Sequence, residues 1–272
     1  MFRNLLLILL VTCFSKYNAQ GVKFYGEFIP GSAVFGNAEG AKEIKLDERE
    51  IKIDSSGNFI LGFDRDDIGE FLLKVKFDSG KVLLKKITLA EREYKIQRID
   101  NMNPDMVEAP AKEKARIKKE SEIIKEARSG IGKVDTAYYL SGFIKPVKTN
   151  RITSVFGSQR ILNGVPKNAH NGLDFGAPKG TPVYAAADGI VFLTGDNFYY
   201  NGNFVFLNHG LGLNSFYLHL NKIFVRDGDF VKKGEKIGEI GTTGRSTAPH
   251  LHWGVQWFEK RVDPELLLKI KF

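Results

Sequence analysis

Cysteine is almost absent from the sequence. The chain of 272 residues has one, Cys13, together with three methionines and two tryptophans. Histidine is also scarce, because the chain has five, and all of them lie after residue 169. Chemistry that depends on imidazole is therefore confined to the C-terminal part of the chain.

The first 20 residues have the pattern of a signal peptide, which we expect to be removed. Arg3 precedes an apolar run at residues 5–11 that is too short for a membrane-spanning helix, and small residues near Ala19 offer a cleavage site. Cleavage would remove Cys13 and leave no thiol for a disulfide, a metal site or a nucleophile. The alternatives are an uncleaved N-terminal anchor and a lipoprotein signal at Cys13. We expect a periplasmic or secreted protein, with membrane association only if the N-terminus is retained.

The net charge of the chain excludes few classes of protein, but it favours an anionic partner. Hydrophobic residues make up 43% of the chain, which allows a buried core, and the formal net charge is +8. A basic surface suits a cell-envelope polymer or a membrane surface, although a merely solvated surface explains the charge equally well. No basic motif interleaved with aromatic residues is found, so we expect no nucleic-acid partner.

Composition divides the rest of the chain into three parts. Residues 21–100 contain short β-rich runs separated by the turns "SSGN" and "DSG", which predict a small all-β domain. Residues 101–139 include "AKEKARIKKESEIIKEAR", whose strong helix formers predict a connecting helix. Residues 140–272 return to glycines and short strands, among them "GNFVFLNHG" at 202–210 and "HLHWGVQWF" at 250–258. The fold class is therefore mainly β.

Two histidines stand on alternate residues in "STAPHLHWGV" at 246–255. In a strand, His250 and His252 point to one side while Leu251 and Trp253 point to the other. The apolar pair suits a core, and the two imidazoles would line a cavity in which each could bind a metal or carry a proton. A histidine pair on a solvated strand face is the alternative.

A histidine and a carboxylate lie four residues apart in "HNGLDF". On a straight strand His170 and Asp174 would stand about 13 Å apart, at about 3.3 Å per residue, so a shared ion requires a bend, which Gly172 permits. Two histidines and one carboxylate form a common zinc set that leaves a fourth position for water. The alternative is a surface histidine with a turn-capping aspartate.

The two remaining histidines are less informative alone. In "YLHL", Tyr217 and His219 would share one face of a strand, where a lone histidine is more often structural than catalytic. His209 in "LNHGLG" precedes a glycine turn, and we expect a structural role for it.

Taken together, the motifs H-x-x-x-D, Y-x-H-L and G-x-S-x-x-P-H-L-H follow one another in this order. With the runs "RITSVFGSQR" and "VRDGDFVKKGEKIGEIG" and the closing "VDPELLL", residues 143–264 resemble the lysostaphin/LytM-type zinc metalloendopeptidases. The earlier part looks like the N-terminal domain of a proteobacterial subgroup of that family. One departure is a longer segment, "GSQRILNGVPKNAH", before the H-x-x-x-D motif.

The resemblance implies an open antiparallel sheet with a long groove at residues 140–272. It implies one zinc ion per chain with His170, Asp174 and His252 as ligands, and His219 and His250 as the catalytic histidines. We expect one of these two to act as general base and the other to hydrogen-bond the oxyanion, and their order stays open.

The implied activity is hydrolysis of peptide bonds in the stem or cross-link peptides of bacterial peptidoglycan, for cell-wall remodelling. Peptidoglycan is then the partner, and envelope proteins are further candidates. The alternative is a non-catalytic wall-binding protein or amidase activator of the same fold. A biotinyl- or lipoyl-like carrier module would leave the histidines unexplained. A further hypothesis is that the connecting helix holds the N-terminal domain over the groove and inhibits the enzyme.

Overall fold

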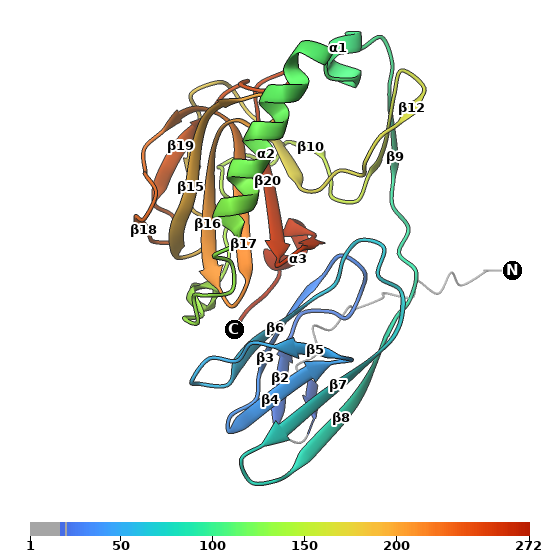
Figure 1. Ribbon diagram of the computed structural model, residues 1–272, viewed down its shortest axis with the longest axis vertical. Coiled ribbons are helices and arrows are strands. Elements are labelled where there is room, and N and C mark those ends of the chain that lie inside the picture. The colour runs from blue at the N-terminus through green and yellow to red at the C-terminus, as the bar shows by residue number, and fades with distance from the viewer. Residues whose placement is uncertain (1–16, 20) are drawn as a thin grey trace, which may run out of the picture.

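The computed structural model describes residues 17–19 and 21–272. The expected signal peptide lies outside the described residues, apart from strand β1 (Tyr17–Ala19), which pairs with β2 (Val22–Tyr25). In this described part of the chain, no helix has the length and apolar character that crossing a membrane requires. Two β-rich parts lie one above the other in Figure 1.

The N-terminal part consists of two antiparallel four-stranded sheets, in the orders β1-β2-β3-β6 and β5-β4-β7-β8. Along β7 (Gly69–Phe77) and β8 (Val82–Leu89), shielded and exposed residues alternate, so one face of that sheet turns to the core. Gly80 has a φ of 82° in the "DSG" turn between these strands, a conformation that favours glycine. The other strands are β3 (Ala33–Asn37), β4 (Ala41–Leu46), β5 (Arg49–Ile51) and β6 (Asn58–Gly62).

The C-terminal part is built on a ten-stranded sheet with antiparallel pairing. Its main path runs β10-β13-β20-β17-β16-β15-β18; β19 lies beside β17, β14 lies beside β19, and β21 lies beside β20. The strands are β10 (Ile152–Ser154), β13 (Leu173–Gly176), β14 (Pro182–Tyr184), β15 (Gly189–Phe198), β16 (Gly202–Gly210), β17 (Leu213–Ile223), β18 (Phe230–Val231), β19 (Lys236–Ile240), β20 (His250–Trp257) and β21 (Lys260–Val262). The predicted mainly β fold, with an open antiparallel sheet after a small β domain and a helix, is confirmed.

The connecting helix is α2 (Lys114–Arg128), which lies along the face of β15 and β16 in Figure 1. Ile124 and Ala127 pack against a cluster of apolar side chains on that face. The cluster consists of Leu193, Phe204, Phe206 and Phe216. The helix therefore covers the sheet. The remaining helical segments are α1 (Pro104–Val107), η1 (Ala111–Glu113), η2 (Tyr138–Ser141) and α3 (Pro264–Leu267).

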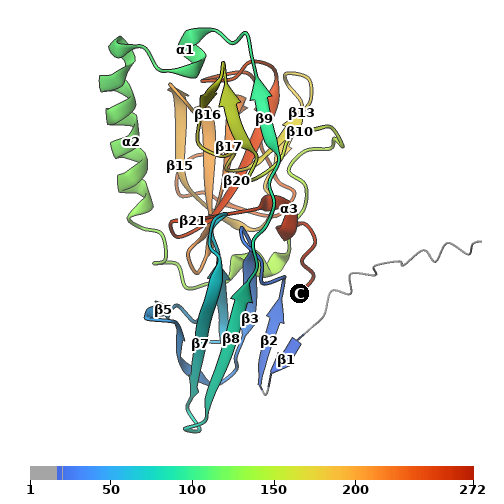
Figure 2. The same ribbon diagram turned by 90° about the vertical axis from the view of Figure 1, so that its right-hand side faces the viewer.

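The two β-rich parts share one hydrophobic core. A single cluster of buried apolar side chains includes Phe35 of the N-terminal part and Trp257 of the C-terminal part. Trp257 packs so closely on Gly62 that a Cβ there would lie 2.5 Å from its ring. The ring of Phe272 lies 5.7 Å from that of Tyr25 and 5.2 Å from that of Phe35, and Figure 2 shows the C-terminus beside the N-terminal sheets.

One strand leaves the N-terminal part altogether. Sequence assigns Ile96–Ile99 to the domain at 21–100, whereas in the structure this strand, β9, pairs in parallel with β11 (Gln159–Leu162). β12 (Val165–Pro166) completes this three-stranded sheet, so the long segment before His170 forms a hairpin. β9 runs up beside the C-terminal sheet in Figure 2. Local sequence could not predict this, because the partner strand lies some 60 positions further on.

Candidate metal centre

Two neighbouring strands bring Asp174 and His252 together. In the pairing of β13 with β20, Asp174 stands opposite His252, so both side chains emerge from the same face. The adjacent pair, Leu173 opposite Trp253, is fully buried on the other face. The alternation expected from "HLHW" thus anchors one side of the strand in the core and presents polar side chains on the other.

His170 reaches the same place from the loop before β13. The chain bends between His170 and Leu173, so the His170 Nε2 atom lies 3.0 Å from Asp174 Oδ1 despite the separation expected for a straight strand. At Gly172, an added Cβ would lie 2.6 Å from the Trp253 carbonyl oxygen and 2.7 Å from His252 Nε2. Glycine is needed here because the bend passes directly against β20.

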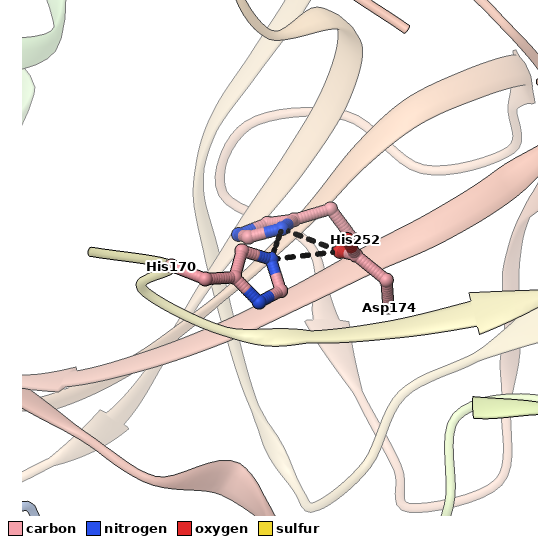
Figure 3. A group of neighbouring side chains, drawn as sticks. All are labelled: His170, Asp174 and His252. Atoms are coloured by element: carbon pink, nitrogen blue, oxygen red, sulfur yellow. Dashed lines mark hydrogen bonds and ion pairs between the residues drawn. The ribbon is translucent and has the colours of Figure 1, made fainter. Parts of the chain in front are cut away.

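Three donor atoms converge between these side chains, as Figure 3 shows. His252 Nδ1 lies 2.8 Å from Asp174 Oδ1, and His170 Nε2 lies 3.0 Å from each of these atoms. Ligand atoms about 2.0–2.1 Å from a tetrahedral zinc ion stand about 3.3 Å apart, so the arrangement fits one small cation with little movement.

The protonation of His170 supports the same interpretation. Its Nδ1 lies 3.0 Å from the carbonyl oxygen of Val155, which can only accept, so Nδ1 carries the hydrogen and the neutral ring has a lone pair on Nε2. That lone pair faces the Asp174 carboxylate and His252 Nδ1. Electron-rich atoms repel one another at such short distances, and a cation bound between the three atoms would offset that repulsion.

The electrostatics favour a charged Asp174 carboxylate beside a neutral His252 ring. Burial raises the pKa of Asp174, but the His170 and His252 side chains beside it outweigh that effect and hold the pKa well below its usual range. Burial lowers the pKa of His252 to about 4. Neutral imidazole and ionised carboxylate are the forms that bind metals.

Two further imidazoles lie beside the three donor atoms. The rings of His219 and His250 are 4.8 Å apart, and the ring of His219 is 6.3 Å from that of His252. His250 Nε2 lies 4.0 Å from Asp174 Oδ1, which is too long for a hydrogen bond. The structure therefore separates a group of three donor side chains from an adjacent pair of free histidines.

The expectation that Tyr217 and His219 share a strand face is wrong. Tyr217 pairs with the core residue Trp253, and its hydroxyl accepts a hydrogen bond from the backbone of Ala186. A bulge follows, because three steps along β17 match two along β16, and His219 has a φ of 65°. The bulge reverses the alternation and turns His219 toward His250. Left-handed backbone in a residue other than glycine is strained, which is typical of functional sites.

His219 and His250 have the same hydrogen-bonding arrangement. Nδ1 of His219 lies 2.9 Å from the carbonyl oxygen of Thr243, and Nδ1 of His250 lies 2.8 Å from that of Ala248. Each Nδ1 must therefore carry a hydrogen, which leaves Nε2 of each neutral ring with a lone pair. Both rings can accept a proton through Nε2.

Comparison with known proteins identifies the part of the chain that carries this centre. Residues 168–264 match the family model for peptidase family M23. These residues form an M23 peptidase domain. The family resemblance inferred from the sequence motifs is therefore confirmed.

Several proteins are similar to the M23 domain or to the whole chain. Peptidoglycan DD-endopeptidase ShyA of Vibrio cholerae is 49% identical over 105 residues, which are 38% of this chain and 24% of ShyA. DD-carboxypeptidase/endopeptidase Mpg of Neisseria meningitidis is 40% identical over 121 residues, which are 44% of this chain and 28% of Mpg. This chain thus spans only about a quarter of the length of these relatives.

One solved structure extends the likeness beyond the M23 domain. A Pseudomonas aeruginosa protein assigned to peptidase M23 is 26% identical, with a TM-score of 0.65. The match covers 89% of this chain and 95% of that one. The arrangement of the N-terminal sheets with the M23 domain therefore has a counterpart of known structure.

The candidate metal centre of the M23 domain lies in a cleft of about 730 Å³. His219, His250, His252 and Asp174 all line it, whereas one side is formed by Gln97, Ile99 and Met102, together with Leu162 of β11. None of the described lining residues belongs to the two N-terminal sheets. In this conformation the N-terminal sheets leave the cleft open.

Three polar residues that sequence did not single out support the centre. Ser154 Oγ lies 3.1 Å from His170 Nδ1, and Gln97 accepts a hydrogen bond from the Ser154 hydroxyl at 3.2 Å. Arg160 Nη2 lies 3.3 Å from Asp174 Oδ2, and burial lowers the pKa of Arg160. No signal in the sequence marks Gln97, since it belongs to a strand far from the histidine motifs.

His209 lies away from the candidate metal centre. It is fully buried, with Nδ1 2.7 Å from the Asp188 carbonyl oxygen and Nε2 2.7 Å from Ser215 Oγ. Both ring nitrogens are thus engaged in the core, and burial lowers the pKa of His209 to about 4. The side chain holds β16 against its neighbours.

Proposed function

We propose that this chain is a zinc-dependent endopeptidase that hydrolyses peptide bonds in the stem or cross-link peptides of bacterial peptidoglycan. The observation that carries the proposal is the convergence of three donor atoms at 2.8–3.0 Å, beside two imidazoles whose Nε2 atoms are free to take a proton. The names of the relatives ShyA and Mpg, a DD-endopeptidase and a DD-carboxypeptidase/endopeptidase, support wall peptides as the substrate class.

Zinc is the metal that best matches these ligands. Magnesium and calcium prefer sites made of oxygen atoms, whereas two imidazoles and one carboxylate suit zinc. His170, Asp174 and His252 would hold one ion per chain. Zinc held by three protein ligands supplies Lewis acidity and a nucleophile at neutral pH.

The chain's own residues account for proton transfer. Either His219 or His250 accepts a proton at Nε2, since the Nδ1 hydrogen of each is committed to a backbone carbonyl oxygen. A ring that has taken up a proton at Nε2 becomes a donor there and can hydrogen-bond an oxyanion or protonate the leaving amine. A positioned acid or base of this kind contributes about 10²–10⁴-fold in rate.

The charge of the cleft suits an anionic peptide. Four cationic side chains line it: Lys148, Arg151, Arg160 and Arg245. Asp174 is the only acidic residue among the described lining residues, and its Oδ1 atom lies against His170 and His252. A peptide bearing free carboxylates would therefore be attracted to the cleft and oriented in it.

The substrate also requires a location outside the cytoplasmic membrane. We propose that the protein is periplasmic or secreted, as the signal-peptide pattern of the first 20 residues predicts. Mass analysis of the protein recovered from the cell envelope tests this: an N-terminus near residue 20 is expected, and a chain found only in the cytosol would contradict it.

Digestion of purified peptidoglycan tests the activity. Mass analysis of the released fragments should reveal new peptide ends, and a chelator should abolish the release until zinc is restored. The control variant is His219→Ala. It keeps the three side chains proposed to bind the metal but lacks one of the two imidazoles proposed to transfer a proton. Wall that binds the chain but yields no fragments would instead favour a non-catalytic binding protein or amidase activator.

A further inference from the structure

The strand β9 precedes the M23 domain by some 70 positions but forms one side of its cleft. Its pairing with β11 runs from Ile96 opposite Gln159 to Ile99 opposite Leu162. Gln97 and Ile99, which are two residues apart and so on one side of the strand, line the cleft, whereas Arg98 between them does not. The chain segment that leaves the N-terminal sheets is thus built into the site.

A chain of hydrogen bonds leads from β9 to the metal centre. Gln97 Oε1 lies 3.2 Å from Ser154 Oγ, and Ser154 Oγ lies 3.1 Å from His170 Nδ1. Arg160 Nη2 also approaches the same hydroxyl, at 3.4 Å. Ser154 and His170 are both buried, so these contacts have little competition from water.

The direction of each hydrogen bond follows from the groups involved. Arg160 can only donate, and the single His170 Nδ1 hydrogen is shared between the Val155 carbonyl oxygen at 3.0 Å and the Ser154 oxygen at 3.1 Å, so the Ser154 oxygen accepts from both Arg160 and His170. The single hydroxyl hydrogen of Ser154 must then point to Gln97 Oε1. Without that acceptor the hydroxyl is free to rotate, and its hydrogen can turn toward the His170 N–H and displace the ring.

We propose that Gln97 is a positioning residue for the metal centre: through the Ser154 hydroxyl it fixes the orientation of His170, so that the strand before the M23 domain completes the site. The inference rests on the proposed function in that His170 must bind the metal. Partners that orient a metal-ligating histidine typically contribute 10–100-fold in metal affinity, so the contribution is measurable without following catalysis.

The test measures zinc affinity in the full chain by competition with a chromophoric chelator. Gln97→Leu removes the acceptor while keeping most of the volume, and we expect about 10–100-fold weaker zinc binding. Gln97→Glu retains an oxygen that can accept from Ser154 and should bind within a few-fold of the original chain. The matched control Arg98→Gln changes the neighbouring side chain outside the cleft and should leave the affinity unchanged.

A second measurement separates positioning from folding. The metal-free Gln97→Leu chain should melt close to the unaltered chain, because only a partly exposed hydrogen bond is lost. Ser154→Ala should weaken zinc binding to a similar degree, and combining it with Gln97→Leu should add little, since the two act in series.

The outcomes distinguish the two proposals. Zinc affinity of Gln97→Leu within twofold of the original, or full additivity with Ser154→Ala, would overturn the role of Gln97 while leaving the metal centre intact. A Gln97→Leu chain that melts far lower and is not rescued by Gln97→Glu would also overturn it in favour of a structural role. An unaltered chain that binds no zinc would overturn both proposals.

Discussion

The close approach of Gly172 to β20 gives a sharp test of the metal centre. In Gly172→Ala, the new methyl carbon would lie 2.6 Å from the Trp253 carbonyl oxygen and 2.7 Å from His252 Nε2. Comfortable contacts between such atoms are about 3.5–4.0 Å, so the His252 ring must retreat by roughly 1 Å. Metal ligands tolerate only about 0.2 Å of displacement. A His252 ring that has moved away from the new methyl group is therefore no longer placed to bind the metal.

Overpacking of this kind costs about 1–3 kcal/mol, and in Gly172→Ala that cost opposes metal binding. It corresponds to about 5- to 150-fold weaker zinc affinity, measured by chelator competition. The control is Gly130→Ala, where the nearest atom to the new methyl, the Ala127 carbonyl oxygen, lies at 3.7 Å and no loss is expected. Unchanged zinc affinity in Gly172→Ala would refute the reasoning, because His252 would then have room to spare.

Three further predictions concern the ligands, the core and the N-terminal part. His252→Ala should lose zinc, whereas His250→Ala should keep zinc and lose hydrolysis; full zinc in purified His252→Ala would contradict the assignment. The pKa of His209 falls from 6.5 to about 4 on burial, so the unfolded chain binds the proton first and stability drops by about 3 kcal/mol as pH falls from 6.5 to 4. Urea unfolding should show a flatter pH dependence in His209→Gln, and equal slopes would exclude this origin. Residues 140–272 alone lack β9 and the N-terminal half of the shared core, so this fragment should hydrolyse wall more slowly than the full chain; a faster fragment would favour self-inhibition.

Parts of the candidate metal centre could be predicted from the sequence because their determinants are local. The alternation in "HLHW" puts Leu251 and Trp253 into the core and His252 toward the cleft, as strand geometry requires. The need for a bend at Gly172 could be predicted because His170 and Asp174 would lie too far apart on a straight strand to share an ion. The strands at 202–210 and 250–257 could be located because turn residues bound them.

The features that sequence did not predict depend on long-range pairing or on irregular backbone. The bulge before His219 is defined by the register of β17 with β16, and nothing in "YLHL" reveals it. The participation of Gln97 depends on a parallel pairing with β11 that only the folded chain establishes. Ser154 and Arg160 lie in stretches of ordinary polar composition, and their roles depend on the side chains that the fold places beside them.

The packing of Phe272 against Tyr25 and Phe35 has a consequence for how the molecule comes apart. Because the last aromatic ring of the chain lies among the first strands, a protease that cuts the exposed helix α2 would leave two fragments still held together by their buried side chains. Such a nicked protein would migrate as one particle under native conditions and separate only in denaturant. Heating should likewise melt both β-rich halves in one cooperative step.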